Sequence, residues 1–170
     1  TAGTPLIGIE SSAILTFRDE YIDLADDEHL TTARHLSNNV FLVDEFIARE
    51  IENGNINTAQ FTKEERKIKL HGHCQQKALS SVMHSKRLLT LPRNYQVEII
   101  PSGCCGMAGS FGYEKEHYEL SMKIGELVLF PSVRNANHDT IIAAPGTSCR
   151  HQVKDGTGRV ALHPVEVLYE

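Results

Sequence analysis

The sequence lacks the features that mark membrane-spanning, secreted and nucleic-acid-binding proteins. None of its apolar runs approaches the length of about 20 residues that a helix needs to cross a bilayer. Residues 1–5 contain neither the charged nor the apolar segment of a signal peptide. Basic residues form no dense stripe and the net charge is −5, so no nucleic-acid partner is expected. These absences favour a cytoplasmic protein without a transmembrane segment.

Cysteine is also scarce, and its four positions are unevenly spaced. Cys104 and Cys105 are adjacent and flanked by glycine, whereas Cys74 and Cys149 lie far away on either side. Four cysteines in a chain of 170 residues do not suggest a secreted disulfide scaffold. In a reducing compartment, such thiols favour a metal or redox site, with disulfide pairs or unrelated buried thiols as the alternatives.

Short apolar or alternating runs predict strands, and longer segments with helical spacing predict the connections between them. The predicted strands are 6–9 (a short buried one), 67–71, 95–100, 140–144 and 159–163. The predicted helices are 11–24, 26–35, 40–53, 75–89, 114–129 and 164–169. This alternation indicates an α/β fold with a mostly parallel sheet flanked by helices.

All four cysteines follow predicted strands, near 68–70, 96–100 and 140–144. Ligands of parallel α/β proteins collect beyond the carboxyl ends of the strands, so we expect the four thiols to meet there. A [4Fe–4S] cluster needs four thiolates, and the chain has four cysteines. Four thiolates also suit structural zinc, although the short Cys-x-x-Cys pairs of most zinc sites are absent.

Several neighbours of the cysteines are candidates for a supporting role. Gly103 and Gly106 would allow a sharp turn that brings amide N–H groups near sulfur. Histidines at the cysteine corners could bind metal, donate to sulfur or be ordinary strand-end residues. We prefer His73 and His151, each of which lies next to or near a proposed ligand, over His71 and His163.

Other features near the cysteines carry less specific signals. Lys77 and Arg150 could offset the negative charge of a cluster or be solvated helix-start residues. The glycine-rich stretch 106–112 lacks the spacing of a nucleotide-binding loop and is expected to pack beneath the site, where Met107 and Phe111 would exclude water. A cysteine hydrolase built on Cys74 would leave three cysteines unexplained.

These residues resemble the cysteine-rich CCG domain family. That family includes the cysteine-rich subunit of heterodisulfide reductase and the iron–sulfur subunits of glycolate oxidase and anaerobic glycerol-3-phosphate dehydrogenase. The nearest likeness is to the C-terminal iron–sulfur region of FAD-linked D-2-hydroxy-acid oxidases. The similar stretches are 17–21, 73–79, 102–113, 121–126, 146–152 and 155–159, together with His163.

The resemblance implies an iron–sulfur electron-transfer domain of a flavin-dependent oxidoreductase that passes electrons from FAD elsewhere to an acceptor. Cys74, Cys104, Cys105 and Cys149 would hold the [4Fe–4S] cluster. FAD would belong to a partner dehydrogenase domain or subunit, so this chain would not be catalytic alone. Peripheral attachment to the inner membrane through partners stays open. The alternative is a structural or interaction module with zinc or an empty site.

The family usually has two cysteine-rich repeats, and the chain departs from that pattern. Residues 1–66 would be the tail of a first, degenerate repeat with a helical connection, and residues 67–170 a complete second repeat. The absence of an initial Met suggests one compact unit excised from a longer chain. Ala13 stands where the first repeat often has cysteine, and Gln152 where a second cysteine often follows Cys149. The resemblance therefore implies a single four-cysteine cluster.

Overall fold

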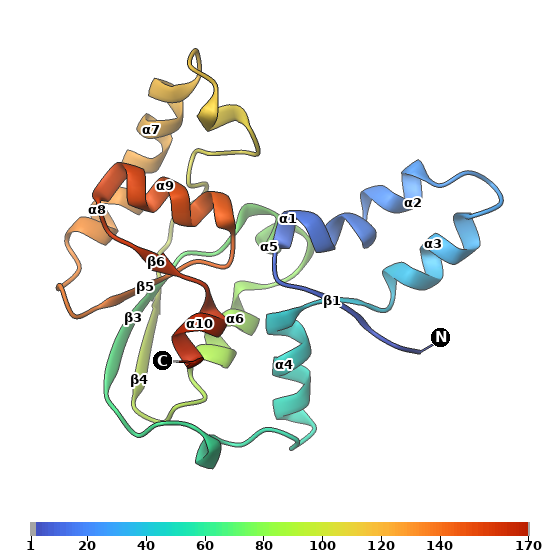
Figure 1. Ribbon diagram of the computed structural model, residues 1–170, viewed down its shortest axis with the longest axis horizontal. Helices are drawn as coiled ribbons and strands as arrows, with labels where there is room; N and C mark the ends of the chain where they lie inside the picture. Colours follow the sequence, from blue (N-terminus) through green and yellow to red (C-terminus); the bar gives the residue numbers. More distant parts are fainter. Residues whose placement is uncertain (1–2, 170) are drawn as a thin grey trace.

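The computed structural model describes residues 3–169, which form two parallel sheets flanked by helices (Figure 1). The strands are β1 (Leu6–Gly8), β2 (Val40–Leu42), β3 (Arg66–Leu70), β4 (Tyr95–Ile99), β5 (Ile141–Ala143) and β6 (Ala161–Leu162). The α-helices are α1 (Ser11–Ile14), α2 (Glu20–Leu24), α3 (Leu30–Ser37), α4 (Val43–Glu52), α5 (Cys74–Leu79), α6 (Val82–Leu89), α7 (Tyr118–Leu127), α8 (Leu129–Arg134), α9 (Thr147–Thr157) and α10 (Pro164–Tyr169). Short 3-10 helices are η1 (Leu15–Phe17), η2 (Thr58–Gln60) and η3 (Phe111–Tyr113). The predicted α/β class is confirmed.

The larger sheet has the strand order β4-β3-β5-β6, and all its strands run parallel. Strand β3 pairs on both sides: Ile68 is opposite Val97 of β4 and Ile141 of β5. Because parallel strands end at the same edge of a sheet, the loops that follow β3, β4 and β5 begin side by side. This edge carries the candidate site.

Two apolar layers cover the two faces of the larger sheet. On one face, Phe130 of α8 and Val153 of α9 pack with Ile142. On the other, Leu88 of α6 and Val167 of α10 pack with Ile68. The two layers bury the middle of the sheet, whereas Gln96 and Glu98 on the edge strand β4 stay exposed. Among residues 3–169, no helix combines the length and apolar character that a membrane crossing requires.

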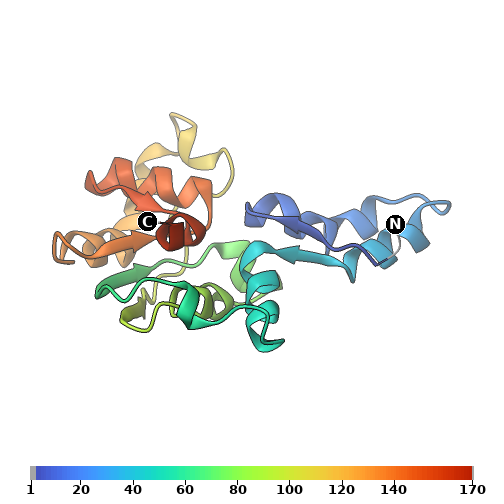
Figure 2. The same cartoon turned by 60° about the horizontal axis from the view of Figure 1, so that its bottom comes forward.

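Residues 3–42 form an N-terminal arm that projects away from the larger sheet (Figures 1 and 2). Its two-stranded parallel sheet, β1 with β2, is accompanied by α1, α2 and α3. The strand predicted at 6–9 forms as β1, but the prediction that it is buried is wrong, since Leu6 and Ile7 are 38% and 40% exposed. Within the described residues, β1 has only β2 beside it, so this strand lies at an edge.

Several predicted helices are shorter than expected. The predicted helix 11–24 divides into α1, η1 and α2, and the predicted helix 75–89 divides into α5 and α6. The second break has a local cause, because Ser81 Oγ accepts a hydrogen bond from the Met83 amide (3.2 Å) and caps α6. The predicted helix 114–129 becomes α7, which ends at Leu127, and α8 begins at Leu129. Pro131 lies in the first turn of α8, where a backbone N–H group would have no hydrogen-bond partner within the helix.

Phe130 packs between two helical glycines. A Cβ atom added to Gly125 of α7 or Gly156 of α9 would lie 2.3 Å from Cζ of its ring. This distance is far shorter than a carbon–carbon contact, so α7 and α9 can approach α8 only because both positions lack a side chain.

We predict that Gly156→Ala lowers the free energy of unfolding by about 1–2 kcal/mol, because the clash outweighs the gain in helix propensity. Urea unfolding of the two proteins measures the difference. In a Phe130→Leu background, which lacks the Cζ atom, the same substitution should cost less. An equal cost in both backgrounds would show that the ring is not the cause.

Arg18 joins the N-terminal arm to α4 and α5. Its guanidinium donates to both carboxylate oxygens of Glu45 (2.9 and 2.7 Å) and to the carbonyl oxygens of Val40 (2.6 Å) and Leu79 (3.0 Å). Burial alone would raise the pKa of Glu45, but hydrogen bonds from Arg18, Ser80 and the Leu42 amide lower it below its ordinary value. The ionised carboxylate is therefore favoured in the folded chain.

We predict that Arg18→Met lowers the free energy of unfolding by about 2–3 kcal/mol near neutral pH, because it leaves the Glu45 carboxylate without its charged partner. A carboxyl with a lowered pKa stabilises the fold above its unfolded value of 4.5, and this contribution is lost as the pH falls below it. The difference between wild type and variant, measured by urea unfolding from pH 7 to pH 3.5, should shrink at the acidic end. A constant difference would contradict the ion-pair explanation.

Candidate metal centre

The four cysteines come together at the carboxyl edge of the larger sheet. Cys74 begins α5 after β3, Cys104 and Cys105 lie on the loop after β4, and Cys149 lies in the first turn of α9 after β5. All four line one cavity of about 600 Å³. The four thiols thus meet at the carboxyl ends of the parallel strands, as predicted.

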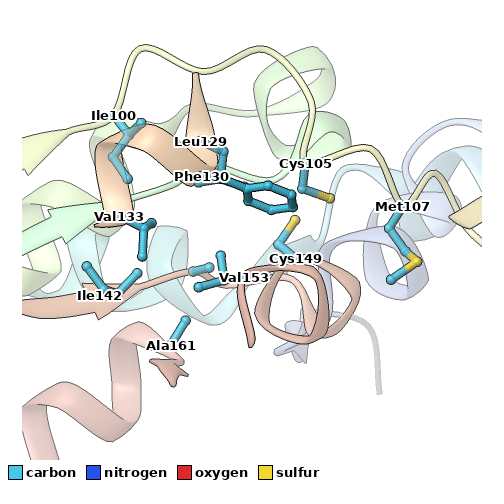
Figure 3. Close-up of a cluster of buried hydrophobic side chains, with 11 residues drawn as sticks. Ile100, Cys105, Met107, Leu129, Phe130, Val133, Ile142, Cys149, Val153 and Ala161 are labelled. Atoms are coloured by element: carbon cyan, nitrogen blue, oxygen red, sulfur yellow. The ribbon is translucent and has the colours of Figure 1, made fainter. Parts of the chain in front are cut away.

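The four thiols differ in depth. Cys149 and Cys105 are buried, with exposed fractions of 0% and 2%, whereas Cys104 is half-buried and Cys74 is exposed. Figure 3 shows the sulfur atoms of Cys105 and Cys149 pointing toward one another beside the ring of Phe130. The cavity therefore has a closed, apolar inner side and an open outer side.

None of the four cysteines forms a disulfide, and hydrogen bonds among their thiols shift their pKa values. Hydrogen bonds from the thiols of Cys105 and Cys74 lower the pKa of Cys104 to about 2, with help from the Gly106 amide. A hydrogen bond from Cys105 lowers the pKa of Cys149 to about 5. The pKa values of Cys74 and Cys105 are raised, chiefly because both donate to Cys104. All four thiols must be deprotonated before their sulfurs can bind a cation.

The glycine at position 106 is required by the backbone. Its φ is +100°, and a Cβ atom there would lie 2.2 Å from the carbonyl oxygen of Ser121. Its amide nitrogen is 3.2 Å from Cys104 Sγ, as the predicted amide-to-sulfur contact requires. Gly103, by contrast, has a free space where a Cβ atom would stand and no positive φ, so its backbone needs no glycine.

Two basic side chains hold the cysteine loops rather than facing solvent. Lys77 Nζ donates to the carbonyl oxygens of Ser102 (2.9 Å) and Gly103, just before the adjacent cysteines. Arg150 donates to the carbonyl oxygens of Ala144 (3.0 Å) and Pro145 (2.8 Å), just after β5. Both cations therefore fix the backbone from which the thiols project.

The two preferred histidines have partners away from the thiols. His73 Nδ1 accepts from the Gln75 amide (3.2 Å) and caps α5, although its ring lines the cavity. His151 Nδ1 is 2.8 Å from the hydroxyl of Tyr113 on the exposed surface. Neither contact supports a direct role at the sulfur atoms.

His71, which the sequence did not favour, groups with the buried thiols. This residue is completely buried, and one of its ring nitrogens lies within 4.8 Å of the sulfur atoms of Cys105 and Cys149. Its amide donates to the Ala143 carbonyl (2.8 Å), which continues the pairing of β3 with β5 by one residue. That extension, which sets the position of the ring, is invisible in the local sequence.

Met107 and Phe111 differ in their contact with the site. Met107 is 2% exposed and belongs to the same apolar cluster as Cys105 and Cys149, but Figure 3 shows its side chain apart from their sulfur atoms. Phe111 stacks on His117, with 4.2 Å between ring centroids. Phe130, which was not expected at the site, is the aromatic ring beside the buried thiols.

The N-terminal arm supplies one wall of the cavity through Glu10 and Ser12. Glu10 Oε2 accepts a hydrogen bond from the amide of Thr147 (2.8 Å), the first residue of α9. Burial would raise the pKa of Glu10, but the hydrogen bonds from Thr147 and Ser12 lower it below its ordinary value. The turn between β1 and α1, just before Ala13, therefore faces the turn between β5 and α9, just before Cys149.

The chain is similar over nearly its whole length to parts of larger dehydrogenase proteins. It is 30% identical over 169 residues to D-2-hydroxyglutarate dehydrogenase of Escherichia coli (strain K12), and 32% over 169 residues to the protein of that name from Pantoea ananatis (strain AJ13355). Each match covers 99% of the chain but only 16% of the relative.

A second kind of relative is a subunit of the anaerobic glycerol-3-phosphate dehydrogenase of Escherichia coli (strain K12), which is 25% identical over 166 residues. This match covers 98% of the chain and 40% of the relative. No protein-family profile matches, and no solved structure matches. The predicted similarity to proteins of 2-hydroxy-acid and glycerol-3-phosphate dehydrogenases is confirmed, whereas the chain spans a minor share of each.

We predict that iodoacetamide labels Cys104 before Cys74 in the reduced, metal-free chain at pH 6, although Cys74 is more exposed. The thiolate is the reactive form, and the pKa of Cys104 is lowered to about 2 while that of Cys74 is raised. Mass spectrometry after limited labelling identifies the first site. In urea this preference should disappear, and earlier labelling of Cys74 in the folded chain would contradict the arrangement of protons.

Proposed function

We propose that this chain is an iron–sulfur electron-transfer domain in which Cys74, Cys104, Cys105 and Cys149 hold a [4Fe–4S] cluster. The observation that carries the proposal is the convergence of four free thiols, from three strand ends, on one cavity of about 600 Å³. Soft thiolate ligands of this number suit an iron–sulfur cluster.

The surroundings of the thiols fit a cluster that is buried on one side. Cys105 and Cys149 would bind its inner side against apolar side chains, and Cys104 and Cys74 its outer side. The Gly106 amide, 3.2 Å from Cys104 Sγ, and the amino end of α9 would stabilise negative charge on sulfur. When bound, such a cluster supplies one-electron transfer.

The similarity to dehydrogenases suggests where the electrons come from. We propose that FAD in a partner domain or subunit oxidises a 2-hydroxy acid and that the cluster passes the electrons to an acceptor. This chain would then be inactive as a dehydrogenase alone. A cytoplasmic location, with peripheral attachment to the inner membrane through partners, accords with this role.

We further propose that residues 1–66 derive from a first cysteine-rich repeat and residues 67–170 from a second. Two observations support this division. The sheet of β1 and β2 is separate from the sheet of β3 to β6. In addition, Glu10 in the first part and Thr147 in the second meet at the cavity, as equivalent strand-to-helix corners would.

A structural zinc site is the second candidate. His71, Cys105 and Cys149 offer ligand atoms within 4.8 Å of one another, a compact group that suits a single ion. In this case the chain would be an interaction module without redox activity.

We predict about four irons and four sulfides in each chain purified without oxygen, with broad visible absorption that fades on reduction by dithionite. Cys105→Ser and Cys149→Ser should each lose most of the iron. Met107→Leu is the matched control, because it removes a buried sulfur of the same apolar cluster that lies apart from the two thiols.

Metal analysis separates the candidates. One zinc per chain without visible absorption would replace the cluster with the structural site. Oxidation of a 2-hydroxy acid by the isolated chain without a flavoprotein would overturn the assignment to electron transfer.

A further inference from the structure

His71 is a buried polar residue beside the proposed cluster that the four-cysteine ligand set does not use. It follows β3, and its amide donates to the Ala143 carbonyl of the neighbouring strand (2.8 Å). Its side chain is 0% exposed, so the imidazole cannot satisfy its nitrogens with bulk water. Both nitrogens must therefore find partners inside the protein.

Among the described residues, one nitrogen of the His71 ring has a hydrogen-bond partner and the other has none. Nδ1 is 2.7 Å from the hydroxyl oxygen of Ser102, which is itself buried. Within residues 3–169, that hydroxyl group has no other hydrogen-bond partner. If it donates its proton to Nδ1, the neutral imidazole carries its own proton on Nε2. In the part of the chain that the structure describes, Nε2 is buried without a hydrogen-bond partner.

Sulfur is the acceptor within reach. One ring nitrogen of His71 and the sulfur atoms of Cys105 and Cys149 all lie within 4.8 Å of one another. Since Ser102 engages Nδ1, the nitrogen free to face the thiols is Nε2. Negatively charged sulfur accepts hydrogen bonds, and such bonds tune iron–sulfur clusters.

We propose that His71 Nε2–H donates a hydrogen bond to a coordinating sulfur, that of Cys105 or Cys149, and thereby raises the reduction potential of the cluster. This inference rests on the proposed function. Reduction adds one electron to the cluster, and a donor beside its sulfur stabilises the added negative charge more than it stabilises the oxidised form. Ser102 acts one step further away, as the residue that orients the imidazole and selects its tautomer.

The test compares the midpoint potential of wild type with three variants. His71→Leu removes the donor at similar side-chain volume, and we expect the equilibrium constant for reduction to fall about tenfold, or about 59 mV for one electron. His71→Gln, which keeps an N–H group, should restore most of the potential. Ser102→Ala should lower it by a smaller amount, because the tautomer is no longer fixed. Iron and sulfide content should stay at the wild-type level in all three.

Two results would overturn this inference while the proposed function stands. Loss of iron or a change of cluster type in His71→Leu would make the histidine a ligand, and an unchanged potential with a full cluster would make it a structural residue. If wild type holds no iron–sulfur cluster, the proposed function fails first and the inference fails with it.

A measurement on wild type tests the hydrogen bond without any substitution, so it does not depend on whether a variant folds. Pulsed EPR of the reduced cluster in protein labelled with ¹⁵N-histidine should detect a weakly coupled nitrogen, as expected across a hydrogen bond. Strong coupling would indicate direct coordination, and absence of coupling would place the ring away from the cluster. Either of these results contradicts the proposal.

Discussion

The candidate site depends on the parallel pairing of β3 with both β4 and β5. Two backbone hydrogen bonds carry this pairing past the strand ends: the Ile100 amide donates to Leu70, and the His71 amide to Ala143, each at 2.8 Å. The loops therefore leave the sheet from fixed, adjacent points. Cysteines that are far apart in the sequence meet because each lies a few residues beyond one of these points.

The N-terminal arm is held to the rest of the chain by polar contacts and by a small apolar cluster. Leu79 of α5 packs against this cluster, which includes Leu15 and is distinct from the two clusters of the larger sheet. His163, which is buried, lies at this joint, where its Nε2 is 3.2 Å from the carbonyl oxygen of Ile9. A joint of this kind fixes orientation through hydrogen-bond geometry, so the wall that Glu10 gives the cavity has a defined position.

The sequence was sufficient to predict the fold class and the meeting place of the cysteines, because strand and helix periodicity and parallel topology depend on patterns along the chain. It was insufficient for β2, since Val40–Leu42 has helical spacing and becomes a strand only by pairing with β1. The same limit explains why the sequence favoured His73 over His71. His73 is next to Cys74 in the sequence, but His71 reaches the buried thiols because of the register of β3 with β5, a long-range property.

Under the proposed function, the separation of the cysteines along the chain also links folding to metal supply. Cys74, the pair Cys104 and Cys105, and Cys149 come from three strand ends, so the unfolded chain contains no preformed site with four sulfurs. A cofactor that binds all four selects the folded state, and its binding free energy adds directly to the free energy of unfolding. Resistance of the chain to proteolysis then reports how much of the protein is loaded.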